Sequence, residues 1–266
     1  MTVENDDGTG LRLAILRQED EEEDEEMVGK EEETISQEQQ EHYVIRSSTP
    51  NPTTLIIRQL PSQGLSFQLW PAASTLMSFL DQSSSSSSNS PFLSSISQRP
   101  IRILELGSGT GLVGIAAAAI LGAHVTITDL PHVLPNLQFN ANTNATAVAS
   151  NSGVVDVRCL RWGEPEDMAS IGHQFHLLLA SDVVYHDHLF HPLLQTLSFF
   201  LQGDVGLVMA HLRRWKKDSA FFKKAKKLFD VTMIHRDDPL PGSRTGVVVY
   251  HFAEKGRNKT IMEPIL

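Results

Sequence analysis

The chain has 266 residues, of which 41% are hydrophobic and 20% are charged, and its formal net charge is −10. These values are those of an ordinary soluble protein with room for one large domain and a shorter extra segment. The single cysteine, Cys159, excludes an intrachain disulfide and favours a reducing compartment, so we expect a cytoplasmic protein, with the nucleus as a second compartment.

The acidic charge of the chain is concentrated at its N-terminal end. Residues 1–41 hold 16 of the 32 acidic residues but only 3 of the 22 basic ones, which predicts a disordered acidic tail followed by a folded domain over residues 42–266. The remaining 16 acidic and 19 basic residues make that domain slightly basic. The longest apolar run, residues 112–121, is about half as long as a membrane span. We expect no membrane and no nucleic-acid partner.

A hairpin, a helix and a loop are predicted between the tail and residue 98. Residues 42–46 and 54–59 are β-prone and are separated by turn-forming residues, a pattern typical of a hairpin. Apolar residues then recur at helical spacing over residues 64–80, with Pro71 in the first turn, which predicts a helix. The serine-rich segment 82–98 is predicted to be a flexible surface loop.

From residue 101 the sequence alternates between buried strands and helices. An apolar strand at 101–106, a helix at 112–121 and a β-branched strand at 125–128 form one βαβ unit of a parallel sheet. The two C-terminal strands, 229–235 and 245–253, are joined by a connection too short for a crossover helix, so they pair antiparallel. The predicted fold is therefore α/β, a doubly wound sheet with an antiparallel end. Between these segments the pattern predicts strands at 154–160, 175–181 and 205–210 and helices at 131–144, 188–201 and 218–228.

A glycine-rich loop directly follows the first strand of this unit. The sequence Glu105-Leu-Gly107-Ser-Gly109-Thr-Gly111 lets the backbone turn tightly between a strand and a helix, close to a ligand. Asp129 ends the next strand, 20 residues after Gly109, where its carboxylate can accept both ribose hydroxyls of an adenosine group. The loop and the acid together predict a cofactor that contains adenosine.

Two adenosine cofactors fit this loop to different degrees. Residues 109–114 match the dinucleotide pattern G-x-G-x-x-G, which leaves an NAD-linked oxidoreductase open. In the dinucleotide fingerprint the first glycine makes the turn at the strand end, whereas here that turn begins at Gly107, preceded by the acidic Glu105. A carboxylate repels a pyrophosphate and tolerates the cationic ammonium and sulfonium groups of S-adenosylmethionine, so the charge favours S-adenosylmethionine.

Four segments resemble the motifs of one methyltransferase family. Residues 105–111 resemble the first motif of class I S-adenosylmethionine-dependent methyltransferases. Three more segments resemble the family-16 group of these enzymes, the methyltransferase-like protein-lysine methyltransferases: G-L-S-F-Q-L-W-P-A-A at 64–73, L-R-W-G at 160–163 and S-D-V-V-Y at 181–185. The Asn-Pro-Pro-Tyr sequence of exocyclic-amine and glutamine methyltransferases does not occur in the chain. The resemblance covers about residues 42–253.

The resemblance implies a Rossmann-like sheet of seven strands with the last strand antiparallel, and S-adenosylmethionine as the cofactor. It implies that Trp162 offers its ring to the adenine and that Asp129 holds the ribose. It also implies that Asp182 and Tyr185, at the end of the fourth strand, are the catalytic residues beside the transferred methyl group. The cofactor contacts that it implies are Trp70, Glu105, Gly107, Gly109, Asp129, Trp162 and Ser181.

Asp182 and Tyr185 suit the alignment of an amine. Methyl transfer from a sulfonium is an in-line displacement, so the enzyme has to orient a neutral amine and exclude water from it. A carboxylate and a phenol oxygen accept hydrogen bonds from the nitrogen, and the expected substrate is a lysine side chain of another protein, methylated by a monomeric enzyme. A small-molecule N-methyltransferase, a noncatalytic binding module and a histidine acceptor remain alternatives. No metal site is expected at His186, His188 and His191, which have no thiolate partner.

Overall fold

The computed structural model describes residues 38–45, 52–85, 96, 99–239 and 245–256. The predicted acidic tail lies outside the described residues up to residue 37, as do residues 86–95 of the predicted serine-rich loop. The predicted hairpin is present as β1 (Gln39–Ile45) and β2 (Thr53–Gln59). Two boundaries differ from the prediction, because β1 begins within the segment assigned to the tail and α1 (Pro71–Ser85) extends into the segment assigned to the loop.

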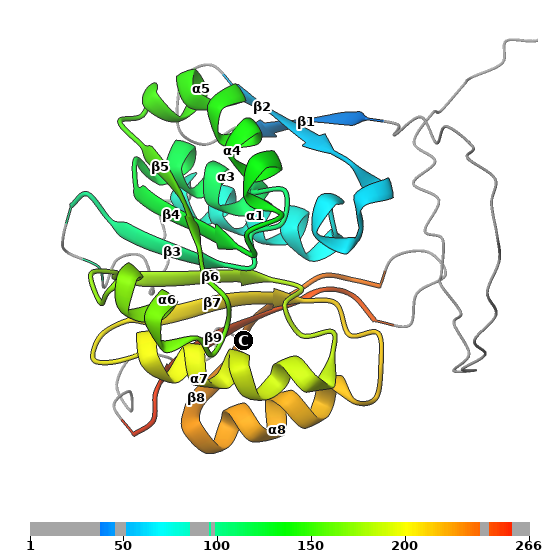
Figure 1. The fold of residues 1–266 in the computed structure, drawn as a ribbon, viewed down its shortest axis with the longest axis vertical. Helices are drawn as coiled ribbons and strands as arrows, with labels where there is room; N and C mark the ends of the chain where they lie inside the picture. Colours follow the sequence, from blue (N-terminus) through cyan, green and yellow to red (C-terminus); the bar gives the residue numbers. More distant parts are fainter. Residues whose placement is uncertain (1–37, 46–51, 86–95, 97–98, 240–244, 257–266) are drawn as a thin grey trace, which may run out of the picture. The chain divides into compact units, whose positions relative to one another are not determined.

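The central sheet consists of seven strands: β3 (Arg102–Leu106), β4 (His124–Asp129), β5 (Val154–Cys159), β6 (Leu177–Ser181), β7 (Gly206–His211), β8 (Phe229–Arg236) and β9 (Val248–Glu254). Their order in space is β5-β4-β3-β6-β7-β9-β8 (Figure 1). The strands β3 to β7 run parallel, whereas β9 is antiparallel to both of its neighbours. The strand order reverses between β3 and β6, which lie side by side. The predicted seven-stranded, doubly wound sheet with an antiparallel last strand is confirmed.

Helices cover both faces of this sheet (Figure 1). Because alternate side chains of a strand point to opposite faces, each inner strand contributes to two cores. Leu177 of β6 belongs to the core beneath α1 and α3, and the adjacent Leu178 belongs to the core beneath α7 and α8. Burial on both faces explains why these strands read as continuous apolar runs in the sequence. One face carries α1, α3 (Leu112–Leu121), α4 (Leu134–Thr143) and α5 (Ala145–Ala149), and the other carries α6 (Pro165–Ile171), α7 (Phe190–Phe200) and α8 (Asp218–Leu228).

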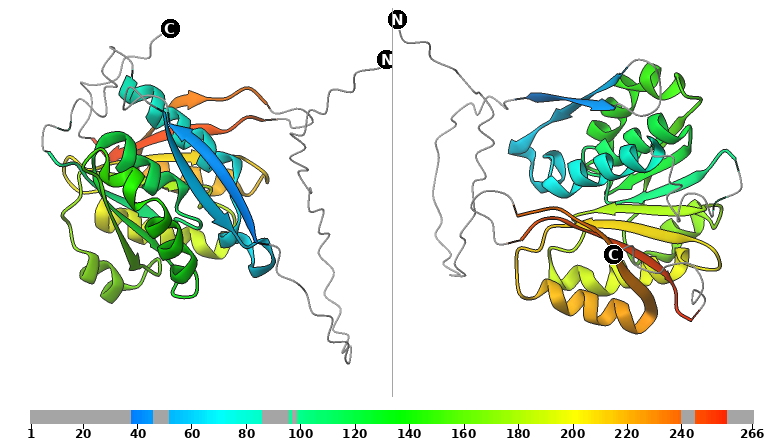
Figure 2. Two further views of the ribbon diagram at one scale, coloured as in Figure 1. Left: turned by 90° about the horizontal axis from the view of Figure 1, so that it is seen from above. Right: turned by 180° about the vertical axis from the view of Figure 1, so that it is seen from behind.

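The hairpin packs beside α4 and α5 and does not join the central sheet (Figure 2). Asparagine side chains take the place of a neighbouring strand. Asn140 accepts the N–H of Arg58 at 2.9 Å and donates to its carbonyl at 3.0 Å. Asn144 pairs with the N–H and carbonyl of Ile56 at 2.9 and 2.8 Å. Asn140 also donates to the carbonyl of Thr110 at 2.9 Å, so the hairpin is joined to the glycine-rich loop.

Some helix boundaries differ from the sequence prediction for local reasons. The helix predicted from residue 64 begins at Pro71, because two 3-10 turns, η1 (Pro61–Gln63) and η2 (Leu65–Phe67), precede it. Proline suits this first helical position since its missing N–H has no partner there in any case. α6 is not predicted from the sequence, because its seven residues make only about two turns and show no clear helical periodicity. Within the described ranges, no helix combines the length and the apolar composition that crossing a membrane requires.

Candidate active site

The candidate site lies at the carboxyl ends of the parallel strands. The loops after β3, β5 and β7 and the ends of β4 and β6 meet at this edge, beside the reversal of strand order. In open α/β sheets this crevice is the place where ligands bind. Asp129 ends β4, Trp162 follows β5, and Ser181 ends β6, where it is partly exposed opposite Ala210 of β7. The strands therefore bring these predicted site residues to one edge of the sheet.

The glycine-rich loop needs glycine for its backbone conformation and for close packing. Gly107 and Gly109 have φ angles of 61° and 55°, in the left-handed region that favours glycine. A Cβ atom on Gly107 would lie 2.9 Å from Cζ2 of Trp162, and one on Gly109 would lie 3.1 Å from the carbonyl oxygen of Ser66. The loop is thus enclosed by the tryptophan of the L-R-W-G motif and by η2, and it forms a narrow cradle at the end of β3.

Asp129 connects the end of β4 to the glycine-rich loop. Its Oδ2 accepts a hydrogen bond from the N–H of Gly109, and its Oδ1 accepts one from the N–H of Leu130, both at 2.7 Å. Burial raises the pKa of this carboxyl above its usual value, although the two N–H donors and the nearby His132 act in the opposite direction. A carboxylate offers about four acceptor positions, so Asp129 keeps the capacity to bind ligand hydroxyl groups.

Glu105 lies beneath the loop and not in the crevice. Its Oε2 accepts a hydrogen bond from the N–H of Gly114, in the first turn of α3, at 3.0 Å, and the residue is 1% exposed. Burial raises the pKa of the carboxyl to about 8, against the opposing hydrogen bonds from Ser108 and Gly114. At neutral pH the group is therefore mostly protonated. Glu105 joins the end of β3 to the first turn of α3, and its contact with a cationic cofactor stays a prediction.

Glu105→Gln is expected to remove part of the pH dependence of stability. The pKa of Glu105 is about 8 in the folded chain, against an ordinary 4.5, so the carboxyl lowers the free energy of unfolding progressively as the pH rises between these values. Relative to wild type, the variant should therefore gain stability between about pH 5 and about pH 8 in denaturant unfolding. The exposed Glu166→Gln is the control and should show no such trend. A difference from wild type that stays constant over the range would contradict the raised pKa.

Asp182 is surrounded by hydrogen-bond donors of its own chain. Its Oδ1 accepts the N–H of Leu212 at 3.0 Å, and its Oδ2 accepts Nη2 of Arg214 at 2.8 Å. Burial alone would raise the pKa of this carboxyl, but the nearby His211 and the hydrogen bonds from Arg214 and Leu212 outweigh burial and hold the pKa below its usual value. The side chain is 5% exposed and these bonds anchor the loop after β7. The hydrogen bond from the substrate amine to Asp182 stays a prediction.

His211, at the end of β7, links Asp182 to α8. Its Nδ1 lies 3.6 Å from Oδ1 of Asp182 and its Nε2 lies 3.4 Å from Oδ2 of Asp218, which are ion-pair distances. Burial alone would lower the pKa of the imidazole, but the two carboxylates outweigh burial and raise it. With Arg214, these residues form a cluster of two carboxyl groups, one guanidinium and one imidazole. No motif marks His211 or Asp218 in the sequence, and only the pairing of β6 with β7 brings them to Asp182.

Arg214 connects the charge cluster to the segment before α1. Its guanidinium carbon lies 4.8 Å from the ring centre of Trp70, a cation–π contact. The indole N–H of Trp70 donates to the carbonyl of Leu65 at 3.0 Å. The structure thus places Trp70 against Arg214, whereas the glycine-rich loop is approached by Ser66 of the same segment. Trp70 stays a predicted cofactor contact that these distances do not test.

Tyr185 follows β6, four residues after Ser181, and its side chain is partly buried. Burial raises the pKa of its phenol, and the negative charge of Asp129 raises it further. The ring of His186 lies beside it, with 4.8 Å between ring centres. The phenol is therefore neutral at physiological pH, and its oxygen can accept a hydrogen bond from a nitrogen that enters the crevice.

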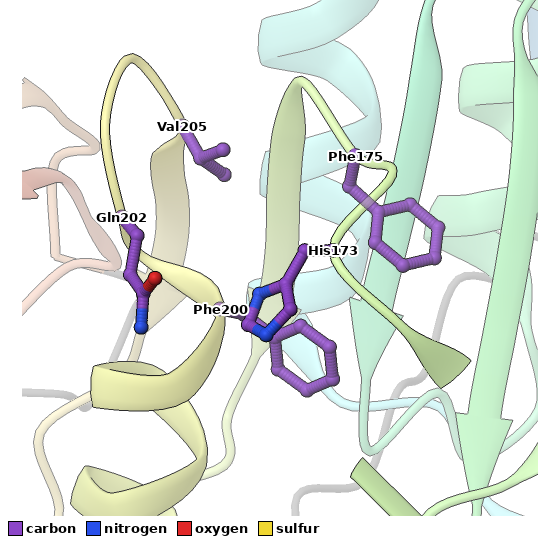
Figure 3. A pocket seen from close by; sticks show the side chains of 5 residues that line it. All are labelled: His173, Phe175, Phe200, Gln202 and Val205. Atoms are coloured by element: carbon purple, nitrogen blue, oxygen red, sulfur yellow. The ribbon is translucent and has the colours of Figure 1, made fainter. Parts of the chain in front are cut away.

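A small cavity lies at the opposite end of the strands, away from these residues. Its volume is about 70 Å³, and the segments leading into β6 and β7 contribute Phe175 and Val205 to its wall (Figure 3). Ligand sites for molecules of cofactor size enclose about 300–1,000 Å³, so this cavity is too small to hold one. It is a packing gap between side chains at the amino ends of the strands. The lining residues are His173, Phe175, Phe200, Gln202 and Val205.

The crevice itself fits a cofactor that contains adenosine. No side chain larger than hydrogen fits at Gly107, so the loop backbone approaches a ligand closely. The buried acid of Asp129 stands at the end of the next strand, where a ribose can be bound, and the Trp162 ring packs against the loop. The assignment of these residues to the adenosine half of the site stays a prediction.

Comparison of the sequence with known proteins shows the family to which the chain belongs. The sequence profile of a family described as lysine methyltransferase matches residues 49–228. Protein N-lysine methyltransferase METTL21A of Danio rerio is 34% identical over 74% of this chain and 81% of the relative, and that of Mus musculus is 35% identical over 69% and 78%. Protein-lysine N-methyltransferase rrg1 of Schizosaccharomyces pombe is 33% identical over 53% and 45%. The matched region contains the glycine-rich loop, Asp129 and Tyr185, and the chain belongs to the lysine methyltransferase family.

Proposed function

We propose that this protein transfers a methyl group from S-adenosylmethionine to the side-chain amine of a lysine in another protein. The observation that carries the proposal is the geometry at the switch point of the sheet, where an enclosed glycine-rich loop is hydrogen-bonded to Asp129 and Tyr185 follows the adjacent strand β6. The membership of the chain in the lysine methyltransferase family supports it, as do relatives named protein N-lysine methyltransferases.

The cofactor half of the site consists of groups that bind without reacting. The backbone at Gly107 and Gly109 would lie against the amino-acid part of the cofactor, Asp129 would hold the ribose hydroxyls, and Trp162 would cover the adenine. Bound S-adenosylmethionine supplies an electrophilic methyl group on a positively charged sulfur. The backbone of Ser66 in η2 packs against the loop at Gly109.

The acceptor half of the site orients a neutral amine. The Tyr185 oxygen accepts a hydrogen bond from the amine nitrogen and so aims its lone pair along the line of displacement. Asp182 contributes indirectly, because its bonds to Leu212 and Arg214 hold the loop after β7 in place. We therefore assign Asp182 a positioning role and Tyr185 the direct contact, and the amine gives up its ammonium proton to solvent before it binds.

Tyr185→Phe is expected to lower the turnover number roughly 10- to 100-fold, because the amine nitrogen becomes positively charged in the transition state and there loses one hydrogen bond worth about 1.5–3 kcal/mol. The dissociation constant of S-adenosylmethionine should change less than about threefold, since the adenosine half of the site is untouched. Single-turnover rates and calorimetry separate the two effects. Tyr250→Phe, on β9, is the matched control and should leave both quantities unchanged. A wild-type turnover number in Tyr185→Phe would remove this tyrosine from the mechanism.

The identity of the acceptor decides between the proposal and its alternatives. Incubation of the protein with labelled S-adenosylmethionine and a proteome from cells that lack it, followed by mass spectrometry, is expected to locate methyl groups on lysine. Label on histidine would change the acceptor, and label only in metabolites would support a small-molecule N-methyltransferase. Binding of S-adenosylmethionine without any transfer would indicate a noncatalytic binding module. We further propose a cytoplasmic enzyme that acts as a monomer, which sedimentation and cell fractionation test.

A further inference from the structure

The exposed face of α8 carries a concentration of positive charge. The residues concerned are all exposed, and in the described part of the chain none of them forms an ion pair with an acidic side chain. The acidic residue of this segment, Asp218, is turned inward to His211, so it does not neutralise the surface. The lysines are Lys216, Lys217, Lys223, Lys224, Lys226 and Lys227.

A groove lies beside part of this positive charge. Its volume is about 450 Å³, and it lies between α8 and the segment that joins Tyr185 to α7. We call it the α8 groove. Phe190 of α7 is buried beneath it and packs on Phe221 of α8, with 5.6 Å between ring centres. The residues that line the α8 groove are Asp187, His188, Phe190, Lys217, Ala220 and Lys224.

Aromatic rings run from Tyr185 toward the α8 groove. The His186 ring lies 4.8 Å from the Tyr185 ring and 5.3 Å from the His188 ring, between ring centres, and His188 lines the groove. The carboxylate of Asp187, on the same side, accepts the N–H of His188 at 3.0 Å. A chain segment whose lysine reaches Tyr185 can therefore continue over the histidines into the groove, where Lys217 and Lys224 meet it.

We propose that the α8 groove binds an acidic segment next to the target lysine of the protein substrate, an inference that rests on the function proposed above. Charge complementarity selects the occupant, because Lys217, which directly precedes α8, and Lys224 of α8 both line the groove and form no ion pair with an acidic side chain of the described residues. The occupant is a protein and not a nucleic acid, because the groove leads to the site of a lysine methyltransferase family member.

Peptide binding tests the proposal without requiring methyl transfer. The probes are two fluorescent peptides of equal length with one central lysine, one flanked by glutamates and aspartates and the other by glycines and serines. We expect the full-length protein to bind the acidic peptide at least tenfold more tightly than the neutral one. Added salt should reduce the difference, because exposed charges are screened over about 10 Å at 0.1 M ionic strength.

Charge-reversed variants locate the binding surface. Lys217→Glu combined with Lys224→Glu should abolish the preference for the acidic peptide and leave the melting temperature unchanged. Lys223→Glu combined with Lys227→Glu makes the same charge change on α8 outside the groove and should retain at least half of the preference. Equal losses in both pairs, no preference in the wild type, or tighter binding of RNA than of the acidic peptide would overturn the proposal. If the acidic peptide binds in the groove but no lysine is ever methylated, the proposed function fails and the docking surface stands.

Discussion

Asp182→Asn is expected to lower the free energy of unfolding by about 3–5 kcal/mol, the usual cost of removing one charge from a buried ion pair. The Arg214 guanidinium, 2.8 Å from Oδ2, and the buried His211 would then face a neutral amide. The side-chain size is kept, and asparagine tolerates the φ of 55° at this position, so the loss reports the charge and not the backbone. Chemical denaturation at neutral pH measures it.

The pH dependence of this loss identifies the partners of Asp182. Its pKa is lowered in the folded chain, so its stabilisation is present above the unfolded value of about 3.9 and is lost as the pH falls through the folded pKa. The pKa of His211 is raised, so its stabilisation is present below about 6.5 and is lost as the pH rises through the folded pKa. The free energy of unfolding of the wild type should exceed that of Asp182→Asn most between about pH 3.9 and about pH 6.5.

Two further variants control this experiment. Asp187→Asn removes an exposed carboxylate five residues away and should change stability by less than about 0.5 kcal/mol. His211→Gln combined with Asp182→Asn should cost less than the sum of the single changes, because both belong to one cluster. If Asp182→Asn unfolds at the wild-type denaturant concentration, the carboxylate is not coupled to its neighbours, and its role in direct substrate contact would have to be reconsidered.

Asp129→Ala is expected to weaken the binding of S-adenosylmethionine by roughly 2–4 kcal/mol, equivalent to about 30- to 1,000-fold in the dissociation constant. The variant loses the acceptor for the ribose hydroxyls and also the bond that holds the N–H of Gly109 at 2.7 Å. Folding should suffer less than in Asp182→Asn, because burial raises the pKa of Asp129 and its ionised form is disfavoured in the folded chain.

Calorimetric titration with S-adenosylmethionine measures this change in affinity. The control is Asp156→Ala, which removes an exposed carboxylate from the neighbouring strand β5 and should leave the affinity within about twofold. Unchanged affinity in Asp129→Ala would reject the assignment of the ribose to this residue. A large loss of melting temperature before any cofactor is added would instead indicate that Asp129 mainly supports the fold.

The sequence determined the sheet because burial on both faces leaves a strong signal. The apolar runs that became β3 and β6 are read without any tertiary information, and the short connection before the last strand already required antiparallel pairing. It also determined where the cofactor half of the site lies. Parallel strands end at one edge, so a glycine-rich loop after one strand and Asp129 after the next had to be neighbours.

Only the tertiary structure decided what each acidic side chain does. Glu105, Asp129 and Asp182 each lie at or next to the end of a strand. Nothing in the sequence distinguishes the surroundings of their side chains. One is protonated beneath the loop, one holds Gly109 beside the crevice, and one is enclosed by a charge cluster. The pKa and accessibility of a carboxyl depend on the donors and charges within a few ångströms of it. For Asp182 those groups come from residues about 30 positions later, which the end of β7 and the loop after it bring to its side.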